Sequence, residues 1–214
     1  MDPLTVLYIC DELGTEAAGT GWERLLARLL PLVEHTRFRP VVVGLGRKPQ
    51  SPILPDTPNV PVSHLVRSKI DPATVTAVLK VLDQVRPHVL HLHGRSASTF
   101  GRIAGALRRL PIVLQQDDEG NGRRGPLAKT MDRVLAPSTD VVLASSTGGA
   151  EFAVRVRFLP AARVKVMDAG ADNVDVLLAR LDRLYHLLSC TPRLGRRPGI
   201  APEDLAFLEE RPQR

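Results

Sequence analysis

The chain has 214 residues, 43% of them hydrophobic, which is enough to form a substantial core in one large domain or two small ones. No apolar run is long enough to span a membrane, the first residues lack a secretory signal, and two cysteines cannot form a disulfide framework, so we expect a cytoplasmic protein. The net charge of +6 is compatible with an anionic substrate and at most a peripheral membrane contact, whereas an aromatic content of 4% argues against nucleic acid as a partner.

The first predicted element is a buried strand over residues 4–10, which a loop over residues 11–21 joins to a helix. Thr20 and Glu23 have the spacing of a capping box at the start of that helix. Glycines let a backbone approach a ligand closely, and a helix N-terminus favours negative charge, so this loop is a candidate anion site. Its candidate phosphate-binding residues are Gly14, Gly19, Thr20 and Gly21. A plain connection between a strand and a helix is the alternative.

Strands and helices then alternate along the chain. Further strands are predicted over residues 40–45, 60–65, 89–94, 111–115, 140–144 and 164–167. Further helices are predicted over residues 72–85, 96–109, 127–135 and 151–158. The strands are apolar without polar alternation, which indicates burial on both faces. The predicted fold class is therefore α/β, a doubly wound and mostly parallel sheet of about seven strands with helices on both faces.

Right-handed crossovers bring the loops that follow parallel strands to one edge of the sheet, and we place the functional site there. The loops that meet at this edge cover residues 11–21, 93–95, 115–120 and 145–149. Gly94 and Arg95 are candidate substrate- or phosphate-binding residues. Ser145 is either a helix N-cap or a ligand hydroxyl. Arg95 and Arg102 are candidates to hold an anionic acceptor, with a solvated helix face as the alternative.

Two histidines share one face of the strand over residues 89–94. No Cys, Asp or Glu lies at ligand spacing from them, so we predict no metal site. His91 is most simply a core residue, and His93, at the strand end, is the better candidate for ligand contact. Asp118 and its acidic neighbours Asp117 and Glu119 are candidates for a general base or for a hydrogen-bond partner of a sugar hydroxyl. The alternative is that they form a solvated acidic loop.

The pattern changes after Asp172. An apolar stripe at helical spacing predicts an amphipathic helix over residues 173–190, with Asp172 as its N-cap. We expect this helix to pack on the sheet of residues 1–172, with partner binding as the alternative. Residues 191–214 are rich in proline and arginine and are predicted to be a loose tail with one helical turn at residues 203–209.

Four segments carry a family resemblance. They read Gly-Thr-Gly-Trp-Glu-Arg at residues 19–24, Arg-Pro-His-Val-Leu-His-Leu-His at 86–93, Asp-Val-Val-Leu-Ala-Ser at 140–145, and Arg-Val-Lys-Val-Met-Asp-Ala-Gly-Ala-Asp at 163–172. In this order they resemble the N-terminal lobe of family 4 glycosyltransferases. The resemblance implies one Rossmann-like lobe of a GT-B fold, which holds the acceptor. It also implies that the first glycine loop faces the donor phosphates, and that a C-terminal lobe with paired glutamates binds the sugar nucleotide.

The chain departs from the family pattern at several points. The 42 residues that follow Asp172 are too few for a second lobe, and no Glu-x7-Glu motif lies in a donor-binding context. Gln115 stands where the family often has a functional histidine, and glutamine cannot exchange protons near neutral pH. Thr20 replaces the first glycine of the family's pair, and Ala169 replaces an asparagine.

The leading hypothesis is an acceptor lobe that binds a glycosyl acceptor and also contacts the donor diphosphate. Such a lobe is inactive alone, or it transfers a hexosyl group only together with a donor lobe on a separate chain. It assigns acceptor-side catalytic roles to His93 and Asp118, requires no cofactor, and takes a nucleotide sugar as donor substrate. Its partners are a donor-lobe chain or a second copy, together with the glycosyl acceptor. The alternatives are a non-catalytic binding or scaffold protein, and an NADP-type dinucleotide domain, which lacks the expected third glycine.

Overall fold

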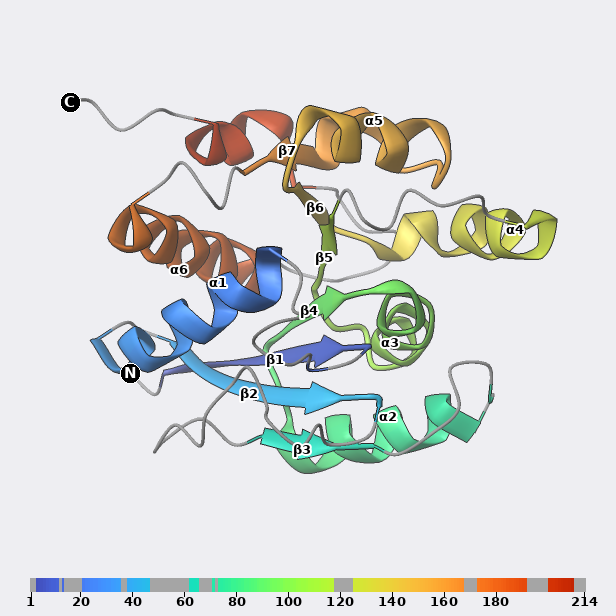
Figure 1. Cartoon of the computed structure of the whole chain (residues 1–214), viewed down its shortest axis with the longest axis horizontal. Helices are drawn as coiled ribbons and strands as arrows, with labels where there is room; N and C mark the ends of the chain where they lie inside the picture. The colour runs from blue at the N-terminus through green and yellow to red at the C-terminus, as the bar shows by residue number, and fades with distance from the viewer. Residues whose placement is uncertain are drawn as a thin grey trace.

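The computed structural model describes residues 3–11, 13, 21–35, 38–46, 62–65, 71, 73–117, 125–167, 173–191 and 200–209 (Figure 1). Its strands form one sheet in the order β3-β2-β1-β4-β5-β6-β7, and every described pair of neighbours is parallel. The strands are β1 (Leu4–Cys10), β2 (Phe38–Gly44), β3 (Val62–His64), β4 (Val89–His93), β5 (Ile112–Gln116), β6 (Val141–Ala144) and β7 (Val164–Val166). The predicted doubly wound α/β sheet is confirmed.

Helices cover both faces of the sheet. The α-helices are α1 (Gly21–Leu29), α2 (Ala73–Val85), α3 (Arg95–Leu107), α4 (Pro126–Leu135), α5 (Thr147–Arg155) and α6 (Val174–Cys190). The short 3-10 helices are η1 (Leu30–His35), η3 (Ala136–Ser138), η4 (Ala161–Arg163) and η5 (Pro202–Leu208). The hydrophobic core on one face includes side chains of α1, η1, α6 and η5, and the core on the other face includes side chains of α2, α3 and α5.

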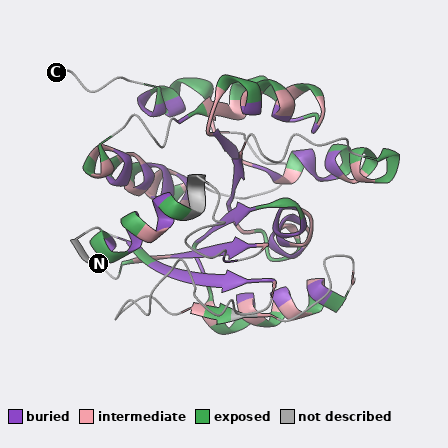
Figure 2. Cartoon of the chain, viewed as in Figure 1, coloured by how far each residue is buried: buried purple, intermediate pink, exposed green. Residues whose placement is uncertain are grey.

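The strand sequences lack polar alternation because both faces are covered. Along β1, Val6 and Tyr8 point into the α1 and α6 layer, whereas Leu7 and Ile9 point into the α2 and α3 layer. All four side chains are almost fully buried, and the central strands are buried along their length (Figure 2). This two-sided burial is what the continuous apolar runs predicted.

Local signals explain where most helices begin and end. The carboxylate of Asp71 accepts a hydrogen bond from the backbone N–H of Ala73 at 2.9 Å and so caps the start of α2. The helix α1 gives way to the 3-10 helix η1 next to Pro31, because a proline cannot supply the N–H that the interior of an α-helix needs. The helix α5 was expected to begin at Glu151, but it begins at Thr147, because Ser146 accepts a hydrogen bond from the backbone N–H of Gly149 and caps it.

The C-terminal segment is part of the core. The stripe of α6 is buried against the sheet, and Asn173, rather than the predicted Asp172, caps this helix by accepting a hydrogen bond from the backbone N–H of Asp175. The predicted helical turn is η5, whose Leu205, Phe207 and Leu208 are buried in the same core. This part of the predicted tail is therefore packed rather than loose. Among the described residues, no helix has the length and apolar character needed to cross a membrane.

Candidate functional site

The strand order reverses between β1 and β4, which are neighbours in the sheet and run parallel with Cys10 opposite His93. Ligands of open α/β sheets bind beyond the carboxyl ends of the strands at such a switch point. His93, Gly94, Arg95 and Ser145 all lie at this edge, and Gly21 is the first residue of α1. The remaining predicted site residues, Gly14, Gly19, Thr20 and Asp118, lie outside the described residues.

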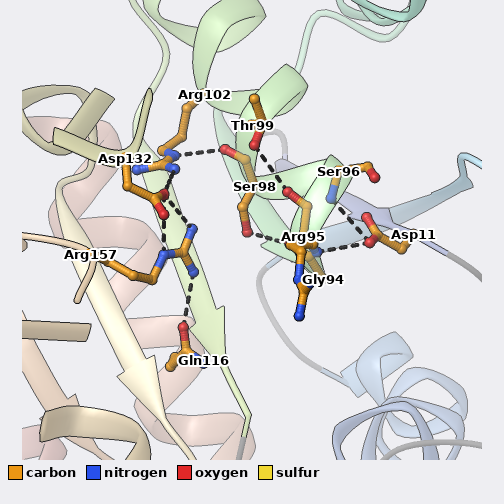
Figure 3. A network of polar contacts seen from close by, with 10 residues as sticks. All are labelled: Asp11, Gly94, Arg95, Ser96, Ser98, Thr99, Arg102, Gln116, Asp132 and Arg157. Atoms are coloured by element: carbon orange, nitrogen blue, oxygen red, sulfur yellow. Dashed lines mark hydrogen bonds and ion pairs between the residues drawn. The ribbon is translucent and has the colours of Figure 1, made fainter. Parts of the chain in front are cut away.

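The carboxylate of Asp11 caps α3 across the switch point (Figure 3). Its oxygens accept hydrogen bonds from the backbone N–H groups of Arg95 at 2.8 Å, Ser96 at 3.0 Å and Ala97 at 2.6 Å. These amides would otherwise form a ready anion site, because the first turn of a helix leaves its N–H groups unpaired. An external phosphate at the start of α3 would therefore compete with Asp11 for the same donors.

Gly94 is the residue that permits this close approach. Its φ of +94° is in the left-handed region, and a Cβ built there would lie 2.6 Å from Cγ of Asp11. Glycine is required at such a position for both conformational and steric reasons. The phosphate-binding role predicted for Gly94 remains a prediction, while the structure gives this glycine a role in the turn from β4 into α3.

His93 lies at the end of β4 and is only 5% exposed. Its ring packs beside Tyr8, with ring centroids 6.0 Å apart, and beside His91, with ring centroids 4.5 Å apart. Burial, with a smaller contribution from His91, holds the pKa of His93 well below its ordinary value. The imidazole is therefore neutral near pH 7, so it can donate or accept a hydrogen bond but does not carry positive charge.

Beneath His93 lies a chain of buried polar groups that joins the sheet to α6. The hydroxyl of Tyr185 lies 2.7 Å from Nδ1 of His91 and 2.9 Å from the hydroxyl of Tyr8. Burial lowers the pKa of His91 to about 3 and raises the pKa of both tyrosines. His91 is fully buried, in agreement with its predicted core role. The described part of the chain contains no cluster of three or more His, Cys, Asp or Glu that could hold a metal ion.

On the other face of the sheet, two arginines meet one buried carboxylate (Figure 3). Nη2 of Arg102 lies 2.5 Å, and Nη2 of Arg157 3.3 Å, from Oδ1 of Asp132. The Nε atom of Arg102 also donates to the carbonyl of Ser98 at 2.6 Å. Because the side chain of Arg102 is completely buried in this pair, it is not available for the anionic acceptor, and that prediction for Arg102 is wrong.

The arginine cluster reaches the carboxyl edge through Gln116. Arg157 donates through Nη1 to the side-chain carbonyl of Gln116 at 2.9 Å, and the amide nitrogen of Gln116 donates to the carbonyl of Asp117 at 2.9 Å. The backbone N–H of Ser145 donates to the carbonyl of Gln116 at 3.0 Å. Ser146 caps α5, so the prediction of Ser145 as a helix N-cap is wrong. The partly buried hydroxyl of Ser145 lies 3.4 Å from the carbonyl oxygen of Gln116, and its predicted role as a ligand hydroxyl stays a prediction.

Three residues that hold this region together, Asp11, Asp132 and Arg157, were not predicted from the sequence. Their contacts join residues that are 25 to 86 positions apart in the chain. A carboxylate directly after the first strand is one local signal that was available for Asp11, because strand ends in this fold face helix N-termini. For Asp132 and Arg157, which lie in or after helices far from the glycine loop, local patterning offers no signal.

Residues 18–170 match the profile of the glycosyl transferase 4-like domain. The fold is similar to that of the Anabaena protein HepE solved with UDP, with 16% identity, a TM-score of 0.56, and coverage of 83% of this chain and 49% of HepE. It is also similar to a Rickettsia africae glycosyltransferase, with 10% identity, a TM-score of 0.60, and coverage of 90% and 52% of the two chains.

A third similar structure is a sucrose-phosphate synthase chain from Thermosynechococcus elongatus, with 12% identity and a TM-score of 0.59. This match covers 85% of the present chain and 97% of that one. The chain spans about half the length of the HepE and Rickettsia africae structures. At these identities the likeness supports the fold alone. No curated protein sequence matches the chain.

Proposed function

Because the chain belongs to the glycosyl transferase 4-like family, we propose that its GT-B lobe binds a glycosyl acceptor and the diphosphate of a nucleotide sugar. The observation that carries the proposal is the reversal of strand order between β1 and β4, which brings Asp11, His93 and the start of α3 to one edge. The UDP bound to the Anabaena neighbour supports a nucleoside diphosphate as the first ligand to test.

The proposed roles follow from the chemistry of each residue. The neutral ring of His93 hydrogen-bonds an acceptor hydroxyl, and Asp118 is the acceptor-side carboxylate. The exposed guanidinium of Arg95 pairs with a phosphate, and the hydroxyl of Ser145 donates a hydrogen bond to a sugar oxygen. The residues proposed to meet the diphosphate through the glycine loop are Gly14, Gly19, Thr20 and Gly21. Gly94 supports the same edge by allowing the close approach of Asp11.

Transfer of a hexosyl group, in this proposal, takes place between two lobes. The sheet described above supplies the acceptor side, and a donor lobe on a separate chain, or a second copy, supplies the groups that hold the sugar nucleotide. Positioning of the two substrates and stabilisation of the departing diphosphate then provide most of the rate. The neutral and buried state of His93 fits this division, because it suits a residue that orients an acceptor.

A non-catalytic binding protein is the second candidate, and Gln115 favours it. This glutamine is buried at the end of β5 opposite His93, where an acid–base residue would be placed for catalysis on the acceptor. The first candidate predicts nucleotide binding and turnover, whereas the second predicts no turnover and does not require a nucleotide as ligand. Hydrolysis or transfer in the presence of a donor-lobe chain distinguishes them.

Thermal denaturation in the presence of UDP, GDP and ADP, their sugar conjugates and NADPH tests the proposal. We expect one nucleoside diphosphate and its sugar to raise the melting temperature and NADPH to leave it unchanged. Arg95→Ala should reduce the shift, whereas the control Arg155→Ala, an exposed arginine on α5 that pairs only weakly with Glu151, should not. A shift with NADPH alone, or none with any nucleotide, would contradict the proposal.

A further inference from the structure

The side-chain amide of Gln116 lies between a buried charged cluster and the chain that leaves β5. The cluster, here named the arginine cluster, consists of Arg102, Asp132 and Arg157. Gln116 is the last residue of β5 and is buried. Its side-chain carbonyl accepts a hydrogen bond from Nη1 of Arg157, and its amide nitrogen donates to the backbone carbonyl of Asp117, both at 2.9 Å. The two ends of one side chain therefore contact two different parts of the molecule.

The orientation of this amide is fixed by its two partners. A guanidinium has only donors, so the atom of Gln116 that faces Arg157 must be the carbonyl oxygen. The backbone carbonyl of Asp117 is only an acceptor, so the atom that faces it must be the amide nitrogen. Glutamine meets both requirements, whereas an ionised glutamate has no donor and asparagine is one methylene shorter. The position therefore selects for glutamine.

The backbone of Gln116 holds a second part of the same edge. Its carbonyl accepts a hydrogen bond from the N–H of Ser145 at 3.0 Å, and the hydroxyl of Ser145 lies 3.4 Å from the same oxygen. Since Ser145 follows β6 and Asp117 follows β5, one residue holds the ends of two neighbouring strands. Asp118, the proposed acceptor-side carboxylate, is the next residue along the chain.

The arginine cluster that orients Gln116 is itself tied to the first turn of α3 (Figure 3). Arg157 and Arg102 both contact Oδ1 of Asp132, and Nε of Arg102 donates to the carbonyl of Ser98 at 2.6 Å. Each of the three charged side chains is at most 3% exposed. Buried polar networks of this kind are rigid, so the start of α3 and the end of β5 are held at a fixed separation.

We propose that Gln116 is a positioning residue, which fixes Ser145 and the chain at Asp117 relative to the start of α3 so that they meet the sugar and the acceptor. This role rests on the proposed function of the edge and adds to it a residue that touches no ligand. The buried side chain acts through its neighbours, because both ends of its amide are already engaged. Misplacing a substrate-binding group by about 1 Å can lower activity roughly a hundredfold, so a residue behind the site can govern it.

Gln116→Glu separates positioning from folding in the ligand-free chain. The glutamate accepts from Arg157 as the glutamine does and adds an ionic attraction, so we expect the melting temperature to stay within about 3 °C of the wild type. It offers no donor to the carbonyl of Asp117, so the end of β5 should loosen. Hydrogen exchange of the Ser145 amide, which donates to Gln116, should then accelerate at least about threefold. The hydrogen-bonded amide of Leu90 in β4 is the internal reference and should exchange at the same rate in both proteins.

Calorimetric titration with UDP, GDP and ADP, each alone and as its glucose conjugate, gives the functional readout. Ser145 and Asp118 are proposed to contact the sugar and the acceptor, whereas Arg95 and the glycine loop are proposed to contact the diphosphate. Gln116→Glu should therefore weaken binding of the sugar conjugate about tenfold and leave binding of the free nucleoside diphosphate unchanged. Gln84→Glu, which makes the same chemical change on the exposed surface of α2, is the matched control and should change neither.

Gln116→Met removes both side-chain hydrogen bonds at a similar side-chain length. It should lower the melting temperature as well as the affinity for the sugar conjugate, because Arg157 loses an acceptor. An unchanged exchange rate of the Ser145 amide in Gln116→Glu would overturn the role of Gln116, whether or not a nucleotide binds. So would equal losses of affinity for the nucleoside diphosphate and its conjugate, because a general distortion of the edge has that effect. A wild-type chain that binds no nucleotide would refute the proposed function instead.

Discussion

The carboxylate of Asp11 occupies the space that a side chain at residue 94 would need, since a Cβ on Gly94 would come within 2.6 Å of Cγ of Asp11. Through this contact the loop after β1 is held against the first turn of α3, and the two elements that flank the switch point become one unit. The geometry of the candidate site depends on this pair.

Gly94→Ala should lower the free energy of unfolding by about 2 kcal/mol or more, because it adds a steric clash to a left-handed backbone conformation. Urea denaturation measures the change. Gly125→Ala is a suitable control, since a Cβ at Gly125 would meet nothing within 4 Å and its φ is −64°. Equal losses in the two variants would show that Asp11 and Gly94 are not coupled as described.

Asp11→Ala should free the three amides of α3 and create an anion site. Without added phosphate, we expect the free energy of unfolding to fall by about 2 kcal/mol, since the cap is charged and accepts three hydrogen bonds. Added phosphate should then raise the melting temperature of the variant more than that of the wild type. An identical response of the two proteins to phosphate would count against Asp11 as the resident anion.

Asp132→Asn should be strongly destabilising, by about 3 kcal/mol or more, because it leaves the buried guanidiniums of Arg102 and Arg157 facing a neutral group. Asp83→Asn removes a carboxylate from a comparably short ion pair with Arg108, but both side chains are largely exposed, so the free energy of unfolding should barely change. Chemical denaturation of both variants tests this contrast, and similar effects would argue that burial does not govern the cluster.

Lowering the pH should begin to destabilise the protein at pH values higher than those at which most carboxylates titrate. His91 and His93 have pKa values below the unfolded value near 6.5, so the unfolded chain binds more protons as the pH falls. Their contribution is complete above about pH 6.5, and we expect the free energy of unfolding to fall as the pH is lowered from 6.5 to 5. His93→Gln should reduce this slope, as followed by the urea midpoint against pH, and an unchanged slope would mean that His93 titrates normally.

Much of the fold was predictable because its signals are local. Apolar runs without alternation marked the parallel strands, and an apolar stripe at helical spacing marked α6. The missed features depend on distant partners or on a choice between adjacent residues, as with Ser146 instead of Ser145. The helical turn at residues 203–209 was predicted, but its packing was not, because the burial of Leu205 depends on core contacts that composition does not reveal.

The central claim, that ligands bind at the carboxyl edge, is tested most directly by amide NMR spectra of the full chain titrated with UDP. We predict saturable shifts for the amides of Gly21, Arg95 and Ser145, with those of Asp83 and Arg108 at the opposite edge unchanged. Shifts confined to Asp83 and Arg108, or a spectrum that neither UDP, GDP nor ADP perturbs at saturation, would contradict the account.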